Sequence, residues 1–521
     1  MSQARPADFL TVQAGVQPGK RAVVDDRGGG GVRCWTYAEL NQQANRLANL
    51  LLGLGVRPRD KVVWCGQNSL GAVRMIHAAR KIGAIAVPLN YRLVPAEMAY
   101  MTGDCGAAVV YIDAEHAASF ASIRDRLPTV QQVLVFDGTP LEGQIQVEEL
   151  LAGASDAEPV VDLAGTAGTM TYTSGTTGRP KGALRTGFGD PGLQQTMVGM
   201  IGYRPDDVYL STGPLYHAAQ GAFLGIATSL GNTVVLQRKF DAEDWLRLLV
   251  EYGVTCTFSA PTPIRMLCNL PAAVKARYDR SGLRIMVANA APWSFALKLQ
   301  YLADFPEDSL WELYGSTELG VNTLLEPKDQ RRKPGSCGKP LPGVEIALFD
   351  DAGARITRPH VPGELAVRSK SVFSTYHNAQ DKYDSNRRGD YMTVGDVAYF
   401  DEEGYFYICD RKSDMIVSGG MKIYPAEVEA ALEIHPDIDD VAVFGIPNEE
   451  WGESVHAVVV PVPGCTPSAE SVIAHARGHL AGYKIPRSVS FATEIPRNAS
   501  GKILKRELRA PFWEGRSRQV V

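Results

Sequence analysis

The sequence predicts an α/β fold in which mostly parallel sheets are covered by helices, followed by a small α+β unit. Two observations predict it. Short apolar runs alternate with amphipathic helical segments through the first half of the chain, and a compact unit of about a hundred residues follows residue 414. With 521 residues, the chain is long enough for two unequal domains, or for three to four domains of about 150 residues.

A strand, a helix and a second strand are predicted over residues 61–88. The apolar run VVWC leads through the helix-capping residues Asn68 and Ser69 into a periodic segment, 70–82, and another apolar run follows. The same alternation recurs between residues 208 and 260, in VYLST, TVVLQ, DAEDWLRLLVEYG and VTCTFSA. Such alternation favours parallel sheets with helices on their faces.

The pattern changes after about residue 340, where GVEIALFDDAG, GELAVRS and VAYFDEEGYFYICDR alternate strands with acidic and glycine-rich turns. These segments predict a different layer. From Asp414 onward, a helix opened by Pro425, strands in DVAVFGI and VHAVVVPV, and a helix around SAESVIAHARGHL predict the α+β unit. The polar stretch CDRKSD, 409–414, is the expected linker.

Charge and cysteine content exclude several classes of protein. Lys and Arg number 53 against 58 Asp and Glu, for a net charge of −5 without a basic block, so no nucleic-acid partner is expected. The eight cysteines are scattered without a C-x-x-C pair, which predicts reduced thiols. The N-terminus lacks the apolar stretch of a signal peptide, and polar residues interrupt the uncharged stretch 208–237. We therefore expect a cytoplasmic protein without a transmembrane segment.

The segment TYTSGTTGRPKGA, 171–183, is the most informative motif. Its five small hydroxyl residues, three glycines and one lysine suit a polyphosphate, because hydroxyl and amide groups donate to oxyanions and Lys181 adds a point charge. A Walker A loop is excluded, since G-x-x-x-x-G-K-[ST] fits nowhere and Pro180 precedes the lysine. On composition alone, a Ser-, Thr- and Gly-rich surface loop is an equally good interpretation.

Three further segments favour the phosphate interpretation. They are YGSTELG at 314–320, GDVAYFDEEGYFYICDRKSDMIVSGGMKIYPAEVE at 395–429 and PRNASGKILKREL at 496–508, in that order. With the first loop, they resemble the signatures of the adenylate-forming superfamily, which includes acyl-CoA synthetases, adenylation domains of nonribosomal peptide synthetases and luciferases. The chain is similar to the acyl-CoA synthetases in particular, over essentially its whole length.

The resemblance implies a domain layout and a reaction. A large N-terminal domain, 1–410, would combine the parallel-rich sheets with a distorted β-barrel subdomain, and a hinge, 411–414, would lead to a small mobile C-terminal domain, 415–521. The implied enzyme is an AMP-forming acyl-CoA ligase that uses ATP, Mg²⁺ and coenzyme A. The substrate carboxylate attacks the α-phosphorus of ATP, which releases pyrophosphate, and the thiol of coenzyme A then displaces AMP from the acyl-adenylate. Both steps develop anionic charge, so the site needs cations and preorganised donors.

The motifs also imply the residues that bind ATP. Glu318 would ligate Mg²⁺ through a hard carboxylate oxygen, and Thr317 would contact the α-phosphate. Asp396 and Arg411 would hold the ribose hydroxyls, although as an isolated pair they are equally well interpreted as an ordinary salt bridge. Tyr314 would stack on adenine. The complete set expected around ATP is Thr173, Ser174, Gly175, Thr176, Thr177, Gly178, Lys181, Ala290, Ala291, Pro292, Glu312, Tyr314, Asp396 and Arg411.

Lys502, in NASGKIL, resembles the catalytic lysine of the superfamily. That lysine reaches the α-phosphate and carboxylate oxygens during adenylation and leaves when the small domain rotates. Thr317, Glu318 and His217 complete the expected catalytic set. The pattern P-x-x-x-x-G-K, 496–502, also suggests that a lysine acetyltransferase modifies Lys502, because acetylation would remove the charge that adenylation needs.

The segments PLYHAAQG, 214–221, and SGGMKIYP, 418–425, carry the remaining expectations. His217 would shift between the half-reactions and open the route for the pantetheine thiol; without the resemblance, a core histidine is an equally good interpretation. The acyl pocket is expected at Tyr216, His217, Ala218, Gly221, Ala288, Asn289 and Gly315. Coenzyme A is expected at Arg92, through its 3′-phosphate, and at Ser418, Gly419 and Gly420.

The sequence departs from the superfamily pattern at three places. Ser413 stands at the hinge position, where Asp or Lys is common, which bears on the balance between the two conformers. VANAAPWS, 287–294, replaces a sequence of the Gly-Gly-Ala-Pro type, and VGD replaces TGD before the ribose pair. The expected acyl pocket offers small apolar residues without an Arg or Lys to pair with a second carboxylate, which predicts a roomy apolar pocket: Ala218, Ala219, Gly221, Gly225, Ala288, Ala290 and Ala291. The stretch 407–429 also resembles ligases of medium- to long-chain and bulky alicyclic acids. A hydrophobic monocarboxylic acid, bulky or of medium to long chain, is therefore the expected substrate.

Three other functions stay open on the sequence. The acid could be loaded onto the phosphopantetheine of a carrier protein, or the acyl-adenylate could be used by a luciferase-like oxygenase. A non-catalytic acyl or nucleotide sensor is the third alternative, and the presence of Lys181, Glu318 and Lys502 together argues against it. A homodimer is compatible with the sequence.

Overall fold

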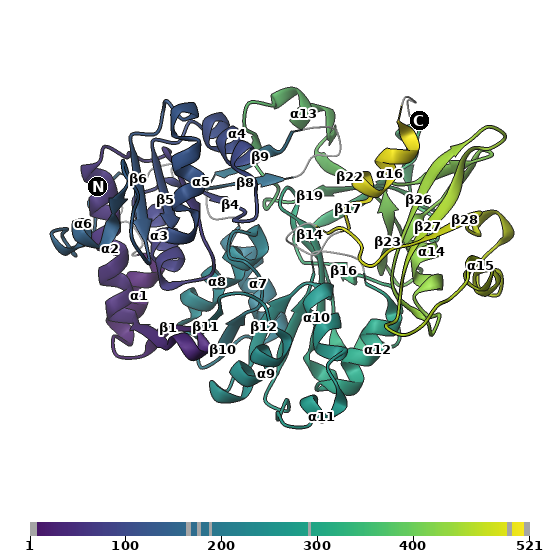
Figure 1. Ribbon diagram of the computed structural model, residues 1–521, viewed down its shortest axis with the longest axis horizontal. Coiled ribbons are helices and arrows are strands. Elements are labelled where there is room, and N and C mark those ends of the chain that lie inside the picture. Colours follow the sequence, from purple (N-terminus) through teal and green to yellow (C-terminus); the bar gives the residue numbers. More distant parts are fainter. Residues whose placement is uncertain are drawn as a thin grey trace.

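The computed structural model of the chain describes residues 8–162, 168–173, 179–186, 190–289, 293–497 and 503–514. Figure 1 shows the N-terminal elements, in purple to teal, on one side of the molecule and the C-terminal elements, in light green to yellow, on the other. Within these ranges, no helix is long and apolar enough to cross a membrane.

The first large sheet contains eight described strands in the order β20-β9-β8-β4-β3-β5-β6-β7. Its strands from β8 to β7 run parallel, whereas β9 and β20 pair antiparallel at one edge. The strands are β3 (Lys61–Cys65), β4 (Ile85–Leu89), β5 (Val109–Asp113), β6 (Gln132–Phe136), β7 (Ile145–Gln146), β8 (Gly168–Thr173), β9 (Lys181–Thr186) and β20 (Thr375–Tyr376).

The predicted strand, helix and strand over residues 61–88 are confirmed. β3 and β4 pair in parallel, and α3 (Leu70–Lys81) connects them. Ser69 caps this helix, because its hydroxyl accepts a hydrogen bond from the backbone N–H of Ala72 at 3.3 Å. The side chain of Asn68 instead bonds the carbonyls of Gly213 and Gln237, which ties this unit to the second large sheet.

The second large sheet contains nine described strands in the order β16-β15-β14-β13-β12-β10-β11-β1-β2. Its centre, from β14 to β1, is parallel, as the alternation in the sequence predicts. The strands are β1 (Arg21–Asp26), β2 (Val32–Thr36), β10 (Val208–Ser211), β11 (Thr233–Gln237), β12 (Cys256–Ser259), β13 (Ile285–Ala288), β14 (Leu310–Ser316), β15 (Gly320–Leu325) and β16 (Lys339–Pro340).

Helices lie between the two sheets and on their outer faces. One continuous core joins both sheets through α2 (Tyr37–Gly53), α3 and α8 (Ala218–Leu230). A second core forms where α9 (Ala242–Glu251), α10 (Pro261–Cys268) and α12 (Phe295–Asp304) cover the second sheet. A third lies under α4 (Pro95–Cys105) and α5 (Ala117–Ser122) on the first sheet. The other helices of this part are α1 (Phe9–Val16), α6 (Val147–Ala152), α7 (Pro191–Ile201), α11 (Ala272–Lys275) and α13 (Gln380–Ser385).

Two antiparallel-rich sheets follow, as the change of pattern after residue 340 indicates. The first consists of β17 (Glu345–Phe349), β18 (Arg355–Ile356), β19 (Gly363–Arg368), β21 (Arg387–Arg388), β22 (Tyr391–Phe400) and β23 (Phe406–Arg411). The second belongs to the α+β unit and consists of β24 (Ile416–Ser418), β25 (Met421–Ile423), β26 (Ile438–Asn448), β27 (Gly452–Pro461) and β28 (Ser488–Phe491). The helices of this unit are α14 (Pro425–Leu432), α15 (Ala469–Arg477) and α16 (Lys505–Arg509). The α/β fold with a small second domain is confirmed.

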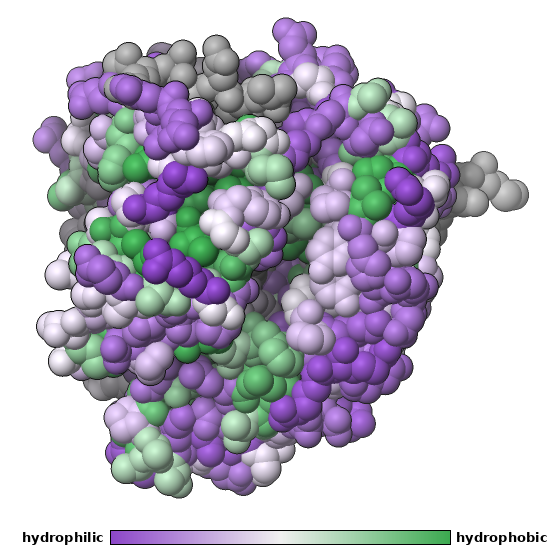
Figure 2. All heavy atoms as spheres, turned by 90° about the vertical axis from the view of Figure 1, so that its right-hand side faces the viewer, coloured by the Kyte–Doolittle hydropathy of each residue, from purple (hydrophilic) through white to green (hydrophobic). Residues whose placement is uncertain are grey.

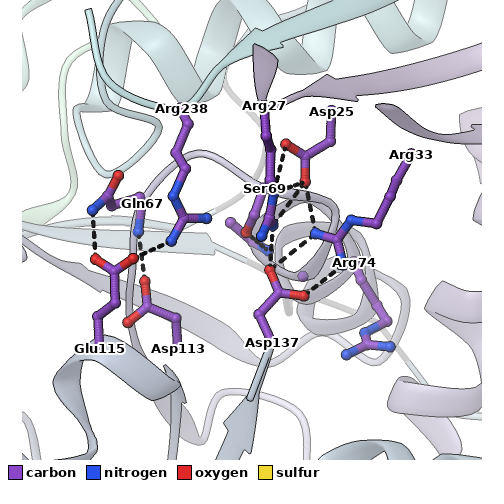
Figure 3. Close-up of polar contacts among 12 residues, drawn as sticks. Asp25, Arg27, Arg33, Gln67, Ser69, Arg74, Asp113, Glu115, Asp137 and Arg238 are labelled. Carbon is purple, nitrogen blue, oxygen red and sulfur yellow. Dashed lines mark hydrogen bonds and ion pairs between the residues drawn. The ribbon is translucent and has the colours of Figure 1, made fainter. Parts of the chain in front are cut away.

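Alternating charges clamp the two large sheets together (Figure 3). Arg27 and Arg33, on the β1–β2 hairpin, each pair with the buried carboxylate of Asp25 and with Asp137, which follows β6, at 2.6–3.0 Å. Burial opposes the charge of Asp137, but the hydrogen bonds from Arg33 and Arg27 outweigh it and lower the pKa of that carboxyl to about 2. The edge of one sheet is thus tied to the end of a strand in the other.

A second clamp holds the N-terminal helix and the segment before residue 162 against α3. The ammonium of Lys81, a side chain with 1% exposure, donates to Thr11 Oγ1 at 2.8 Å and to the Glu158 carboxylate at 2.8 and 2.9 Å. Burial opposes the charge of Glu158, but its hydrogen bond with Lys81 and that cation's charge outweigh it and lower the pKa of Glu158 to about 2.

We expect Lys81→Met to lower the free energy of unfolding by about 2 kcal/mol, since the half-exposed Glu158 recovers part of its hydration. Denaturant unfolding measures the loss, and Lys239→Met, at an exposed lysine, is the matched control. The Lys81–Glu158 contribution is present above the unfolded pKa of Glu, about 4.3, and is lost as the pH falls toward 2. Equal stability of the two variants at neutral pH would contradict this clamp.

Candidate active site

A buried carboxylate, Glu318, lies in the reversal between β14 and β15. Its Oε1 accepts hydrogen bonds from Thr173 Oγ1 at 2.9 Å and from the Tyr376 hydroxyl at 3.1 Å. Thr173 ends β8 and Tyr376 lies on β20, so three elements from two sheets converge on one carboxylate. Burial and the negative charge of Glu318 raise the pKa of Tyr376, which keeps that hydroxyl a donor.

A second carboxylate, Asp396, lies between an arginine and a tyrosine. Arg411 faces Asp396 directly in the β22–β23 register, with Nε 3.4 Å from Oδ1. The Tyr314 hydroxyl, from β14, donates to Asp396 Oδ2 at 2.6 Å. Burial and the charge of Asp396 raise the pKa of Tyr314, so its hydroxyl keeps its proton at neutral pH. The pair expected to hold ribose is therefore also in contact with the tyrosine expected at adenine.

Arg411 connects the two carboxylates electrostatically. Burial opposes its charge, but Asp396 and then Glu318 outweigh burial and raise the pKa of the guanidinium. Gly315 allows the close approach of β14 and β15 here, because a Cβ at this position would lie 2.2 Å from the carbonyl oxygen of Gly320. The geometry brings together residues that the sequence places at 173, 314–318, 396 and 411.

The ends of the glycine-rich loop meet in an antiparallel pair. Thr173, on β8, lies opposite Lys181, the first residue of β9. Ser174, Gly175, Thr176, Thr177 and Gly178 lie outside the described residues. Burial first, and then the charge of Lys181, lowers the pKa of Lys382 on α13, so two cations are close at this edge. The positive charge of Lys181 and Lys382 at this edge of the first sheet suits an anionic ligand.

Arg185 is a site residue that the sequence analysis missed. It lies on β9, is largely buried, and its Nη2 donates to the carbonyl oxygen of Thr317 at 2.9 Å while Nη1 bonds the carbonyl of Ser371. Burial lowers its pKa and the charge of Glu318 opposes that shift. An arginine four residues after the loop lysine, in a strand that reads as buried, is the signal that could have indicated it.

Glu312, expected at ATP, pairs with Lys298 of α12, whose side chain has 1% exposure. The Lys298 ammonium also lies 5.5 Å from the centroid of the Trp293 ring. Ala290, Ala291 and Pro292 precede this tryptophan and lie outside the described residues. Glu312 thus anchors the helix that begins beside the expected adenine segment, a role that its sequence position did not indicate.

Tyr216 and His217 precede α8 on the expected acyl side. Their rings lie 4.6 Å apart between centroids, and the ring of Tyr91 approaches Tyr216 edge-on at 5.5 Å. Ala218 and Gly221 open α8, and a Cβ at Gly221 would only touch the Leu215 carbonyl oxygen, at 3.5 Å. Two other residues expected at the acyl pocket, Ala288 and Asn289, lie in other surroundings. Ala288 is fully buried in the core under α9, α10 and α12, and Asn289 donates its backbone N–H to the Ser259 carbonyl.

The glycines expected at pantetheine form the turn of the β24–β25 hairpin. Gly419 and Gly420 have φ values of 56° and 78°, the left-handed region that a tight hairpin turn of this kind requires. A Cβ at Gly419 would lie 2.6 Å from the ring of Trp451, and the Arg487 guanidinium lies 5.1 Å from that ring's centroid. Ser418, which precedes the turn, is buried. Trp451 is a second residue that the sequence analysis missed.

Ion pairs join the α+β unit to the rest of the protein on both sides of Ser413. Arg265 of α10 lies 3.3 Å from Glu433 and 3.2 Å from Asp440. The largely buried ammonium of Lys505, on α16, lies 2.8 Å from Glu429 and 3.7 Å from Asp410, which precedes Arg411. Lys502 lies outside the described residues. Figure 2 shows the face formed by the C-terminal side, where polar side chains surround smaller apolar areas.

The profile of a family described as "AMP-binding enzyme" matches residues 10–377, and that of "AMP-binding enzyme C-terminal domain" matches residues 427–502. The chain belongs to the AMP-binding enzyme family. It is 34% identical to an indoleacetate–CoA ligase of Aromatoleum aromaticum over 96% of this chain and 97% of that protein. It is also 34% identical to a long-chain-fatty-acid–CoA ligase of Mycobacterium tuberculosis over 92% and 93%.

Solved structures agree with these relatives. The ATP-bound MatB of Rhodopseudomonas palustris superposes on this AMP-binding enzyme with a TM-score of 0.86 at 28% identity, covering 98% of this chain and 99% of that chain. The protein is therefore an AMP-forming acid–thiol ligase of the acyl-CoA synthetase type, which uses ATP, Mg²⁺ and coenzyme A. The resemblance in the four sequence motifs is confirmed.

The residues around Glu318 fit a magnesium ion in this AMP-binding enzyme. Mg²⁺ in nucleotide sites is held by one or two carboxylates together with phosphate oxygens and waters. Glu318 supplies one such carboxylate, and the hydroxyls of Thr173 and Tyr376 reach the same oxygen. Bound there, the ion would neutralise charge on the polyphosphate. Arg411, which pairs with Asp396, also feels the charge of Glu318.

We expect Tyr314→Phe to raise KM for ATP about fivefold, because Asp396 loses a charge-assisted hydrogen bond while the aromatic ring stays. Pyrophosphate release measured against ATP concentration gives the value. Tyr407→Phe is the matched control, since that hydroxyl bonds Asp401 on the same sheet, away from the pair. An unchanged KM in the Tyr314 variant would show that its hydroxyl does not orient the nucleotide-binding carboxylate.

Proposed function

We propose that this ligase activates a hydrophobic monocarboxylic acid, bulky or of medium to long chain, and transfers it to coenzyme A. The small-residue face of α8 carries the proposal. Gly221 and Gly225 lie about one turn apart on this helix, which begins directly after Tyr216 and His217, and a Cβ at Gly225 would meet no atom within 4 Å. The space therefore suits an apolar chain or ring, and the aromatic pair Phe223–Phe258, stacked at 4.6 Å, lies on the same helix and the neighbouring strand.

Similar enzymes support this substrate class. An indoleacetate–CoA ligase, a long-chain-fatty-acid–CoA ligase and a feruloyl-CoA synthase of Amycolatopsis, 35% identical over 92% of this chain, are named for hydrophobic or aromatic acids. These names differ in chain length and ring content. What the three names share is a hydrophobic or aromatic acid, which is compatible with the small residues of α8.

The half-reactions divide between two sets of residues. During adenylation, Lys181, Thr317 and the glycine-rich loop would hold the phosphates, Asp396 and Arg411 the ribose, and Lys502 would stabilise charge on the α-phosphate and carboxylate oxygens. Rotation about Ser413 would then remove Lys502 and bring Ser418–Gly420 to the passage for pantetheine. His217 would move to admit the thiol, and Arg92, exposed beside Tyr91, would bind the 3′-phosphate of coenzyme A.

A carrier protein is the second candidate acceptor. A fatty acid–[acyl-carrier-protein] ligase of Streptomyces coeruleorubidus is 32% identical over 94% of this chain, so the alternative of a phosphopantetheine on a protein has a direct precedent among relatives. The exposed hairpin Gly419–Met421 is compatible with either donor of the thiol.

We also propose a cytoplasmic location and regulation through acetylation of Lys502. A homodimer is the oligomeric state to be tested by light scattering.

Pyrophosphate release across acids from acetate to fatty, aryl and polycyclic acids, with coenzyme A or a holo carrier protein, tests this proposal.

We expect Gly225→Leu to lower kcat/KM for bulky acids at least tenfold and to spare short acids, since a leucine would fill the free space. Gly199→Leu, at another helical glycine with no neighbour within 4 Å, is the matched control. Equal losses for acetate and for large acids, or the best turnover with acetate, would refute the substrate class; thioester formed only on the carrier protein would refute coenzyme A as acceptor.

The division of the half-reactions gives a second prediction. Lys502→Ala should lose pyrophosphate release by a factor of about 100 or more and still convert supplied acyl-adenylate into thioester. Gly420→Trp should do the reverse, because a bulky ring would obstruct the passage formed after rotation; since the φ of 78° strains any side chain here, circular dichroism first checks that the variant is folded. If both folded variants lose both half-reactions equally, the alternation of the small domain is wrong.

A further inference from the structure

His116 contacts the loop that carries Arg92, the residue expected to bind coenzyme A. It ends the short 3₁₀ helix that follows β5, and its ring is nearly buried. Nδ1 lies 2.5 Å from Asp113 Oδ1, and Nε2 lies 2.9 Å from the carbonyl oxygen of Tyr91. Tyr91 belongs to the loop that connects β4 with α4, the same loop that carries Arg92.

The two partners of His116 determine its protonation state. An ionised carboxylate and a backbone carbonyl both accept hydrogen bonds and cannot donate them. A neutral imidazole has one donor and one acceptor nitrogen, so one nitrogen would face an oxygen with its lone pair. Both contacts are hydrogen bonds only when both nitrogens carry a proton. Burial opposes this charge, but the hydrogen bond and charge of Asp113 outweigh it and raise the pKa of His116.

The groups around this imidazolium are themselves held in place (Figure 3). Asp113 Oδ2 accepts the backbone N–H of Gln67 at 3.0 Å, and a Cβ at Gly66 would lie 2.9 Å from the same oxygen. Glu115 adds negative charge near the ring and pairs with Arg238 and the Gln67 side chain. The buried thiol of Cys65 also faces Asp113, and burial with that charge raises its pKa, so it stays neutral.

Tyr91 transmits the position of His116 to two proposed site residues. Its ring lies edge-on to Tyr216 at 5.5 Å, and Tyr216 in turn lies against His217. The Arg92 guanidinium lies 5.5 Å from the centroid of the Tyr91 ring, and the backbone N–H of Arg92 bonds Asn90 Oδ1 at 2.9 Å. The hydrogen bond from His116 to the Tyr91 carbonyl oxygen therefore restrains the backbone that carries both the Tyr91 ring and Arg92.

We propose that His116, as an imidazolium held by Asp113, is a positioning residue that orients the Tyr91–Arg92 loop toward the 3′-phosphate of coenzyme A. The inference rests on the proposed role of Arg92. It assigns the Asp113–His116 pair a part in recognition of the thiol substrate rather than in adenylation. The pair lies outside the four motifs on which the family resemblance is based.

Dephospho-coenzyme A, which lacks the 3′-phosphate, tests the inference. The ratio of kcat/KM for coenzyme A to that for dephospho-coenzyme A reports recognition of this phosphate. We expect Arg92→Ala to lower the ratio about tenfold and His116→Gln about fivefold, because glutamine offers donors on one atom only. The ratio in the double variant should fall no further than it does in Arg92→Ala. KM for ATP and pyrophosphate release without coenzyme A should be unchanged, and His479→Gln, at an exposed histidine just after α15, is the control.

The other outcomes distinguish the proposed role of Arg92 from that of His116. A normal ratio in Arg92→Ala overturns the proposed role of Arg92 itself. A reduced ratio in Arg92→Ala together with a normal ratio in His116→Gln overturns the positioning role alone. If His116→Gln weakens adenylation as much as thioester formation, the histidine is merely structural and the inference is wrong.

The protonation state gives a second readout. An unperturbed histidine titrates near pH 6.5, so the ¹⁵N shifts of the His116 ring nitrogens should titrate at a higher pH than those of a free histidine. The restraint on Tyr91 is fully present below about pH 6.5 and is lost as the pH rises through the folded pKa, so the ratio should fall at that pH. In Asp113→Asn the fall should move to lower pH. A His116 ring that titrates at or below the pH of a free histidine in the wild-type enzyme contradicts the inference.

Discussion

One guanidinium under the charge of two buried carboxylates organises the place where three sheets of this ligase meet. Arg411 faces Asp396 in the strand register and also contributes charge at Glu318, and both carboxylates are buried. A buried charge without a partner costs several kcal/mol, so these groups are stable only when their partners reach them. The strands β8, β14, β20, β22 and β23, from three sheets, must therefore meet at this point. The residues proposed to bind the nucleotide lie at that convergence.

The charges elsewhere in the protein differ in what they restrain. The Asp25, Arg27, Arg33 and Asp137 cluster connects the two large sheets, and the Lys81–Glu158 pair holds the segment before residue 162 against α3. The pair Arg265–Asp440 instead connects α10 to the small α+β unit, and the pair Lys505–Asp410 connects that unit to β23 of the antiparallel sheet. The two residues of each pair lie on opposite sides of Ser413 in the chain, so a rotation about Ser413, if it occurs as proposed, would act on both pairs.

Much of the fold could be predicted because local rules agreed with the tertiary result. Ser69 caps α3, and the apolar runs on either side form β3 and β4 as expected. The motifs predicted the candidate site residues, whose roles stay predictions, and the structure places Asp396 beside Arg411 and under one electrostatic influence with Glu318. Arg185 and Trp451 were missed, since their roles depend on contacts with Thr317 and Gly419, which are 132 and 32 residues away in the chain.

The sequence by itself determined the alternation of strands and helices, because that alternation depends on residue types at short spacing. Its four motifs also indicated the family, and through that resemblance the class of reaction, whereas the polyphosphate role of the loop at 171–183 stays a prediction. Only the tertiary structure decided which charges meet. Glu312 pairs with Lys298 of α12, and His116 lies between Asp113 and the Tyr91 carbonyl. The physical reason is that hydrogen bonds and ion pairs act over about 3 Å, and only the packing of the sheets brings groups distant in sequence within that range.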